Sequence, residues 1–387
     1  MRYSARCRPF LATCLLLLSL ALVTGCNDSV DTAPGTSAAN TTATNSAAPA
    51  LPSDDALRDK LDAVIDFTQD RKMNTQDHAA WQVVHGILAY GGDLNVRHNG
   101  EVVSALDYLL QGGQMTGWKL RPGDHGLEAI VEPGTKTGQG HEDQWLGYLS
   151  QCGLELDQPI IVQDRTFTVR DLMTQAQWDI HEGQEATWTL MGLGTYLPLD
   201  AKWTAKDGTE WSIERIIKME SEQNLTESAC GGSHRMYAIC SALNRYKNEL
   251  KPDKLTGGWL AADKKIKECV KKAHDFQQPD GTFSIEFFDR PATTPDVEKR
   301  LNTTGHVLEF LVMALSDEQL KEPWMTRSVV TLCDMLEQTR EFDLSCGGLY
   351  HSAHGLALYR FRRFGAAPTA VASTPAESDE PPAPEAQ

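Results

Sequence analysis

The chain has 387 residues, enough for one large domain or two of ordinary size. Hydrophobic residues make up 41% of it and charged residues 23%, a composition typical of globular proteins, and no apolar run reaches membrane-spanning length. The formal net charge is −17, and the first 25 residues carry three arginines and no acid, so the rest carries −20. Such an excess repels phosphate backbones and excludes nucleic acid as a favoured partner.

Residues 1–25 have the pattern of an export signal. A basic start precedes the apolar stretch Phe10 to Val23, which is too short to cross a bilayer. The segment Val23-Thr24-Gly25-Cys26 resembles the lipobox of bacterial lipoproteins. That resemblance implies cleavage before Cys26, acyl chains on this residue, and a firm membrane anchor. An ordinary secretory signal, in which Cys26 has no special role, is the alternative.

The residue after Cys26 bears on the compartment. Asn27 stands where well-studied inner-membrane lipoproteins of Gram-negative bacteria carry an aspartate. The resemblance therefore implies a lipid-anchored protein of the bacterial cell envelope, facing the periplasm or the exterior, with the outer membrane favoured.

Two further segments lack apolar periodicity. Residues 26–53 are rich in Ser, Thr, Ala, Asn and Pro and predict a flexible tether, and residues 366–387 predict a disordered acidic tail rich in Pro and Ala. The remaining residues, 54–365, are expected to form one folded domain.

Six cysteines remain in that domain. An even number in an exported chain permits disulfides, and we expect one to three bridges, with free buried thiols as the alternative. No CxxC, HxxxH or HExxH pair occurs, so we expect neither a metal nor another cofactor, with zinc held by three or more converging histidines of separate helices as the alternative. The six are Cys152, Cys230, Cys240, Cys269, Cys333 and Cys346.

The apolar spacing beyond residue 54 is helical almost throughout, and strand-like alternation is almost absent. The helices fall into six pairs. The first members are amphipathic and charged, as in 54–71, 211–223, 259–277 and 323–340. The second members carry few charges and many Gly, Ala, Leu and aromatic residues, which indicates burial on all sides. They span 75–91, 141–152, 184–197, 232–248, 303–315 and 349–364.

A charged outer helix followed by a buried inner helix, six times over, predicts an all-α fold, the (α/α)6 toroid of six outer and six inner helices. An open two-layer superhelix is the alternative. Glycines within the inner helices would let neighbouring backbones approach closely, which offsets their cost in a helix of about 1 kcal/mol each. They are Gly86, Gly147, Gly192, Gly194 and Gly355.

Two motifs resemble known helical toroids. Gln278-Pro279-Asp280-Gly281-Thr282-Phe283 resembles the Q-x-x-G-x-W turn of the terpenoid cyclases and protein prenyltransferases, and Cys346-Gly347-Gly348-Leu349-Tyr350-His351 resembles the Gly-Gly-Leu segment of prenyltransferase β subunits. The resemblance implies the fold alone. No DxDD or DDxxD cluster is present, and Asn302-Thr303-Thr304 stands where the prenyltransferase Asp-x-Cys ligands are expected.

Polar residues recur at the start of the inner helices, each followed three positions later by an aromatic or hydrogen-bonding residue on the same helix face. If the inner helices run in one direction, these faces meet at one end in a polar, aromatic-lined cup. The alternative is that the polar side chains only satisfy helix ends and their neighbours. The series is His78 with Trp81, His141 with Gln144 and Trp145, Glu185 with Trp188, His234 with Tyr237, His306 with Glu309, and His351 with His354.

Two reaction types fit such a cup. Histidines near positive helix ends are expected to be neutral and to act as bases. Glu185 and Glu309 on either side of a sugar linkage would suit glycoside hydrolysis. His234 as base, Tyr237 as acid and Arg235 as charge partner would suit β-elimination from a uronate sugar. The other candidate ligand-binding residues are His78, His141, Trp145, Trp188, His306, His351 and His354.

The sequence thus predicts an envelope-anchored lipoprotein whose cup binds a polysaccharide-like or peptide-like ligand. It leaves open whether the protein is an enzyme, and an enzyme of this kind would be a polysaccharide lyase or glycoside hydrolase. A non-catalytic scaffold for protein interaction is the alternative. We expect a monomer whose partners are the membrane, through lipidated Cys26, and a small-molecule or polysaccharide ligand.

Overall fold

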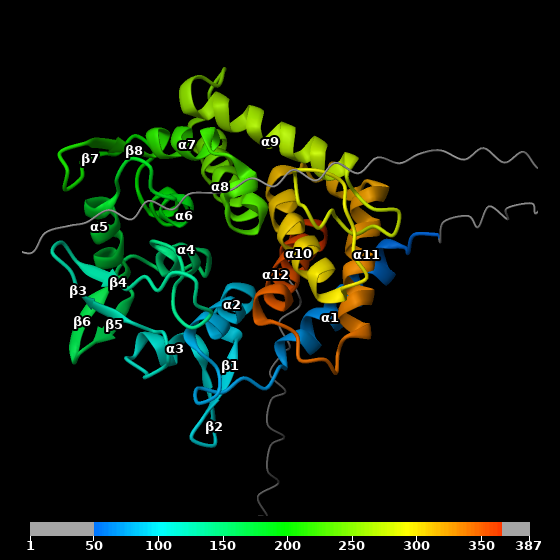
Figure 1. Ribbon diagram of the computed structural model, residues 1–387, viewed down its shortest axis with the longest axis horizontal. Helices are drawn as coiled ribbons and strands as arrows, with labels where there is room; N and C mark the ends of the chain where they lie inside the picture. The colour runs from blue at the N-terminus through cyan, green and yellow to red at the C-terminus, as the bar shows by residue number, and fades with distance from the viewer. Residues whose placement is uncertain (1–49, 366–387) are drawn as a thin grey trace, which may run out of the picture. The chain divides into compact units, whose positions relative to one another are not determined.

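The computed structural model describes residues 50–365 (Figure 1). The predicted export signal, the lipidation site Cys26, nearly all of the tether and the predicted tail lie outside the described residues. Within 50–365 the chain forms twelve α-helices and four two-stranded sheets, which confirms the all-α class. None of these helices combines the length and the hydrophobicity needed to cross a bilayer.

Every predicted helical range overlaps an observed helix. The odd-numbered helices are α1 (Asp54–Gln69), α3 (Ala105–Leu110), α5 (Val169–Asp179), α7 (Ile213–Glu222), α9 (Gly257–Asp275) and α11 (Pro323–Gln338). The even-numbered helices are α2 (Ala80–Tyr90), α4 (Gln144–Gln151), α6 (Thr187–Tyr196), α8 (Ser233–Leu250), α10 (Val297–Ala314) and α12 (Cys346–Phe364).

The even-numbered helices contact one another in chain order, from α2 through α4, α6, α8 and α10 to α12, and α12 also contacts α2. Each odd-numbered helix contacts at least one even-numbered helix. In Figure 1 the even-numbered helices lie toward the middle of the domain, and α1, α5, α7, α9 and α11 lie farther out. This arrangement agrees with composition, because the even-numbered helices have long buried stretches, as in α6, where all residues from Thr187 to Gly194 are buried.

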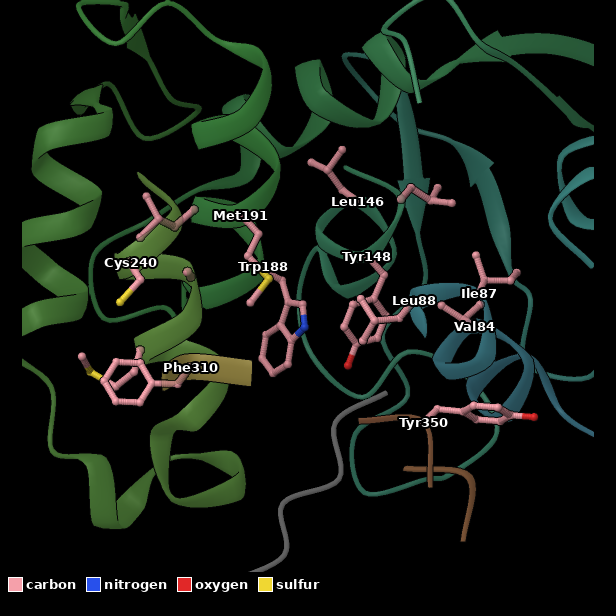
Figure 2. Close-up of a cluster of buried hydrophobic side chains, with 14 of the residues drawn as sticks. Val84, Ile87, Leu88, Leu146, Tyr148, Trp188, Met191, Cys240, Phe310 and Tyr350 are labelled. Atoms are coloured by element: carbon pink, nitrogen blue, oxygen red, sulfur yellow. The ribbon is translucent and has the colours of Figure 1, made fainter. Parts of the chain in front are cut away.

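The core lies between the even-numbered helices. Figure 2 shows side chains that they contribute to it, among them Leu146 of α4, Trp188 of α6 and Phe310 of α10. Two glycines set the spacing of α4 and α6. A Cβ atom on Gly147 would lie 2.9 Å from the Trp188 indole, and one on Gly192 would lie 2.5 Å from Leu146. These two helices therefore approach as closely as glycine permits.

Four β-hairpins were not predicted, so the expectation that strands are almost absent is wrong for the connections. Three of them link an even-numbered helix to the next odd-numbered one, and their strands have only three or four residues, too few to show a clear alternation. Their pairs are β1 (Asn95–His98) with β2 (Glu101–Ser104), β5 (Pro159–Val162) with β6 (Arg165–Thr168), and β7 (Lys202–Thr204) with β8 (Glu210–Ser212). The fourth pair, β3 (Leu120–Pro122) with β4 (Leu127–Ala129), lies between α3 and α4.

The six cysteines of the described domain are all free, so the expectation of one to three disulfides is wrong for this part of the chain. Cys240, Cys269 and Cys333 are buried in the apolar core. Burial raises the pKa of each of these thiols, that of Cys269 to about 12. They therefore behave as small hydrophobic residues.

Candidate functional site

A cavity of about 410 Å³ opens among the even-numbered helices and the segments that lead into them. We call it the central cavity. It is lined by side chains from α2, α4, α6, α8, α10 and α12, and five of them are histidines. The lining includes His85, His141, His234, His306 and His351, the aromatic residues Trp81, Tyr148 and Trp188, and Gln144, Cys230, Asn302, Lys136, Asp296, Glu298 and Lys299.

The imidazole rings form one continuous cluster. The ring centroid of His234 lies 4.8 Å from that of His306 and 4.8 Å from that of His351, and the last two rings are 3.9 Å apart. On the other side, His141 stacks on Trp188 with centroids 4.2 Å apart, and Trp188 lies 5.4 Å from His234. Four predicted histidines, three from separate helices and His141 from the segment before α4, thus meet in one place.

His78 does not belong to this cluster. It lies in the turn before α2, where its Nδ1 accepts a hydrogen bond from the backbone N–H of Asn74 at 3.2 Å. Because α2 begins only at Ala80, the residue at the level of the cavity is His85, four positions after Trp81. The ring of His85 lies 5.1 Å from that of His351, and burial lowers its pKa to about 4.

Three further predicted residues lie outside the lining of the central cavity. Trp145 is fully buried and packs on Trp118 in the core, with centroids 5.6 Å apart. Arg235 points to a buried carboxylate, since its Nε donates to Glu220 at 2.8 Å. The ring of Tyr237 packs near His354, with centroids 6.1 Å apart. All three lie on the even-numbered helices as predicted, but their side chains contact other parts of the fold and not the cavity.

Glu309 lies behind the cavity wall and orients two histidines. The Nδ1–H of His351 donates to Oε2 of Glu309 at 2.9 Å, and the Nδ1–H of His354 donates to Oε1 at 2.7 Å. The Nε2 atom of His351 is buried, has no hydrogen-bond partner among residues 50–365, and belongs to a residue of the cavity wall. Burial holds the pKa of His351 well below 6.5, so this imidazole is neutral and its Nε2 carries a lone pair.

The other predicted carboxylate makes a separate pair. Glu185 accepts a hydrogen bond from Nδ1 of His141 at 2.7 Å, and both side chains are about one-third exposed. Neither Glu185 nor Glu309 lines the central cavity. Glycoside hydrolysis requires two carboxylates that face a common space. Glu185 and Glu309 do not meet this requirement in the central cavity.

Cys230 is a site residue that the sequence analysis did not single out. A ligand atom of Cys230 and one each of His234 and His306 all lie within 4.8 Å of one another. The backbone of Cys230 is left-handed, with φ of 49°, and the next two residues continue with 58° and 76°. Only glycine adopts this conformation without strain, which accounts for Gly231 and Gly232. A Cys-Gly-Gly segment shortly before a histidine occurs twice in the sequence, at Cys230 and at Cys346, and could have indicated this position.

Cys230 and His306 alter each other's ionisation. Burial alone would raise the pKa of the Cys230 thiol, but the adjacent His306 imidazolium lowers it. Burial alone would lower the pKa of His306, but Cys230 raises it to about 9. Burial keeps the pKa of the His234 imidazole well below 6.5, and the neighbouring imidazoles of His351, His306 and His85 lower it further. Cys230 and His306 therefore favour each other's charged forms, next to two imidazoles, those of His234 and His351, whose pKa values are lowered.

Comparisons of the chain with protein-family models, with characterised proteins and with solved structures gave no match.

Proposed function

We propose that the twelve helices form a closed (α/α)6 toroid, with the even-numbered helices as the inner layer. The cyclic order of contacts that returns from α12 to α2 supports this arrangement. The turn after α9 supports the likeness to terpenoid cyclases and prenyltransferases, since Gly281 has φ of 93° and Phe283 is buried between α9 and α10.

We infer that the central cavity binds a polysaccharide-like or peptide-like ligand and cleaves it. One observation carries this inference: the Nε2 of His351 is unpartnered, buried and in the cavity wall, while Glu309 holds the other ring nitrogen. A neutral imidazole oriented by a carboxylate can take a proton from water or from the substrate, and the carboxylate stabilises the imidazolium that forms. Trp81 and Trp188 supply flat apolar walls on which a sugar ring can stack.

The geometry favours His351 over the residues first assigned to catalysis. His234 lies in the cavity, but Tyr237 and Arg235 do not line it, so the β-elimination set lacks its acid and its charge partner. The carboxylate pair lies outside the cavity wall. Hydrolysis or elimination that depends on one histidine base is the reaction class that this site supports best.

The test uses the purified chain in a screen of envelope polysaccharides and peptidoglycan fragments. Ligand binding is measured by thermal shift, and cleavage by product mass. His351→Gln and Glu309→Gln should lower kcat by about 10²-fold or more and change KM little, because they remove the base or its orientation. His274→Gln, on the exposed end of α9, is the matched control. Ligand binding with equal turnover in all variants would exclude His351 as the base, and a protein that binds no candidate would support the scaffold.

We also propose that the chain is a lipoprotein of the cell envelope, anchored at Cys26. The lipobox-like sequence carries this proposal. The full chain expressed in a bacterial host should partition into the detergent phase and yield an acylated amino-terminal peptide by mass spectrometry. Cys26→Ser should abolish both results. Unacylated wild-type protein in the aqueous phase would contradict the anchor.

A further inference from the structure

We propose that Cys230, His234 and His306 bind a zinc ion in the central cavity, with one coordination position left open toward the cavity. The proposal does not depend on the cleavage reaction, because metal binding is measured without a substrate.

The three ligand atoms are already close to a metal-binding arrangement. All lie within 4.8 Å of one another. Tetrahedral zinc, with Zn–S near 2.3 Å and Zn–N near 2.0 Å, brings its ligands to about 3.3–3.6 Å from one another. The closure needed is therefore about 1 Å, which small side-chain rotations supply. The three residues come from only two elements, the start of α8 with the turn before it, and α10.

Neighbouring residues restrict the positions of two of the three proposed ligands, His306 and Cys230. The Nδ1–H of His306 donates to the carbonyl of Asn302 at 2.6 Å, so Nε2 is the atom free to bind a metal. Metal-binding histidines commonly have their other nitrogen oriented in this way. The turn that presents Cys230 packs under Phe287, since a Cβ on Gly231 would lie 2.3 Å from that ring. The backbone that carries the thiol is thereby held beside the cavity, which Cys230 lines.

A second observation points to a ligand at the same place. His351 is 1% exposed, and its unpartnered Nε2 belongs to a ring 3.9 Å from that of His306 and 4.8 Å from that of His234. A buried nitrogen without a partner is rare in native proteins. Water on the open zinc position would give it one, with the metal-bound water donating to His351.

The donor set selects the class of metal. One thiolate and two imidazoles suit zinc, whereas magnesium and calcium prefer oxygen ligands and are excluded by this set. Three protein ligands with an open position are typical of catalytic zinc sites, and structural zinc sites usually have four.

The experiment measures zinc and cobalt on the purified chain after treatment with a chelator. We expect one zinc ion per chain, and a cobalt spectrum with thiolate-to-metal charge transfer and the strong visible bands of tetrahedral coordination. Cys230→Ser should abolish the charge-transfer band, and His306→Gln should weaken zinc binding at least about 100-fold. Cys346→Ser is the matched control, because Cys346 opens the other Cys-Gly-Gly segment but does not line the cavity.

A second measurement keeps the test valid if Cys230→Ser does not fold. The wild-type chain is alkylated with iodoacetamide with and without zinc, and each cysteine is followed by peptide mass. Zinc should slow alkylation of Cys230 at least about tenfold and leave that of Cys346 unchanged. Substoichiometric zinc in the wild type, equal loss of cobalt bands in both cysteine variants, or equal alkylation with and without zinc would overturn the proposal.

Discussion

The two sides of the central cavity differ in chemistry. The side built by α8, α10 and α12 contributes Cys230 and three of the five histidines, in contact with one another. The side built by α2, α4 and α6 contributes mainly aromatic walls, with Trp81, Tyr148 and Trp188. We call the first side, which holds the reactive groups of the proposed function, the reactive side. The other side, whose aromatic residues would face a ligand in that proposal, is the wall side.

The segments that connect the helices can also be compared between the two halves of the domain. In the first half of the domain, the chain leaves α2, α4 and α6 through short hairpins, and each hairpin ends in a Ser or Thr at the start of the next odd-numbered helix. In the second half, the segment between α9 and α10 reaches the cavity lining at Asp296 and carries Phe287 over the cysteine turn. Connecting segments thus reach the cavity on both sides, since Lys136 and His141, from the segment between α3 and α4, also line it.

The largest effect on stability is expected from Arg235→Met, on the reactive side but outside the cavity wall. Glu220 is fully buried and accepts hydrogen bonds from Arg235 and from the start of α6. Removing the arginine leaves an unpaired buried carboxylate and should cost about 3–5 kcal/mol in urea unfolding. Zinc bound per folded chain should not change.

The control for this variant is Arg290→Met, whose ion pairs are exposed and should contribute less than about 1 kcal/mol. Equal stability of both variants would show that the Arg235 pair is not structural. Loss of zinc from folded Arg235→Met would instead show that this arginine supports the zinc site.

An intermediate effect is expected from Gly147→Ala on the wall side. The added methyl meets the Trp188 indole at 2.9 Å, so it should destabilise the protein by about 1–3 kcal/mol and displace the wall. If that wall binds the ligand, Kd in titration calorimetry should rise while the cobalt spectrum stays the same. Gly194→Ala, whose added methyl makes an ordinary contact of 3.6 Å, should have stability equal to or above that of the wild type. A changed cobalt spectrum in Gly147→Ala would contradict the independence of the two sides.

The smallest effect is expected from Asp143→Asn at the start of α4. Burial raises the pKa of this carboxyl to about 6 in the folded protein, against 3.8 for an ordinary aspartate. The folded state then binds the proton more tightly, so stability falls as the pH rises from about 4 to about 6. Asparagine avoids this loss and tolerates the left-handed backbone at φ of 57°.

The variant should therefore be about 1 kcal/mol more stable than the wild type at pH 7.5, since Asp143 is only half-buried, and the difference should vanish near pH 4. Thermal melts at both pH values measure it. A stability difference that does not depend on pH would contradict the raised pKa.

The helices and the meeting of four histidines could be predicted from periodicity and i, i+3 spacing alone. The direction of individual side chains could not be predicted from the sequence. Arg235 pairs with a carboxylate on another helix, and Trp145 packs into the core. His85 was missed because α2 begins five residues later than its apolar pattern suggests. Cys230 was missed because its position depends on three successive left-handed residues, which no pattern of hydrophobicity records.

The most direct test of this account is a crystal structure of the zinc-soaked protein with anomalous data at the zinc edge. The account predicts one strong peak in the central cavity, bonded to Cys230, His234 and His306 and within reach of His351. Well-ordered rings of His234 and His306 that face separate spaces, or a cavity without a zinc peak, would contradict it.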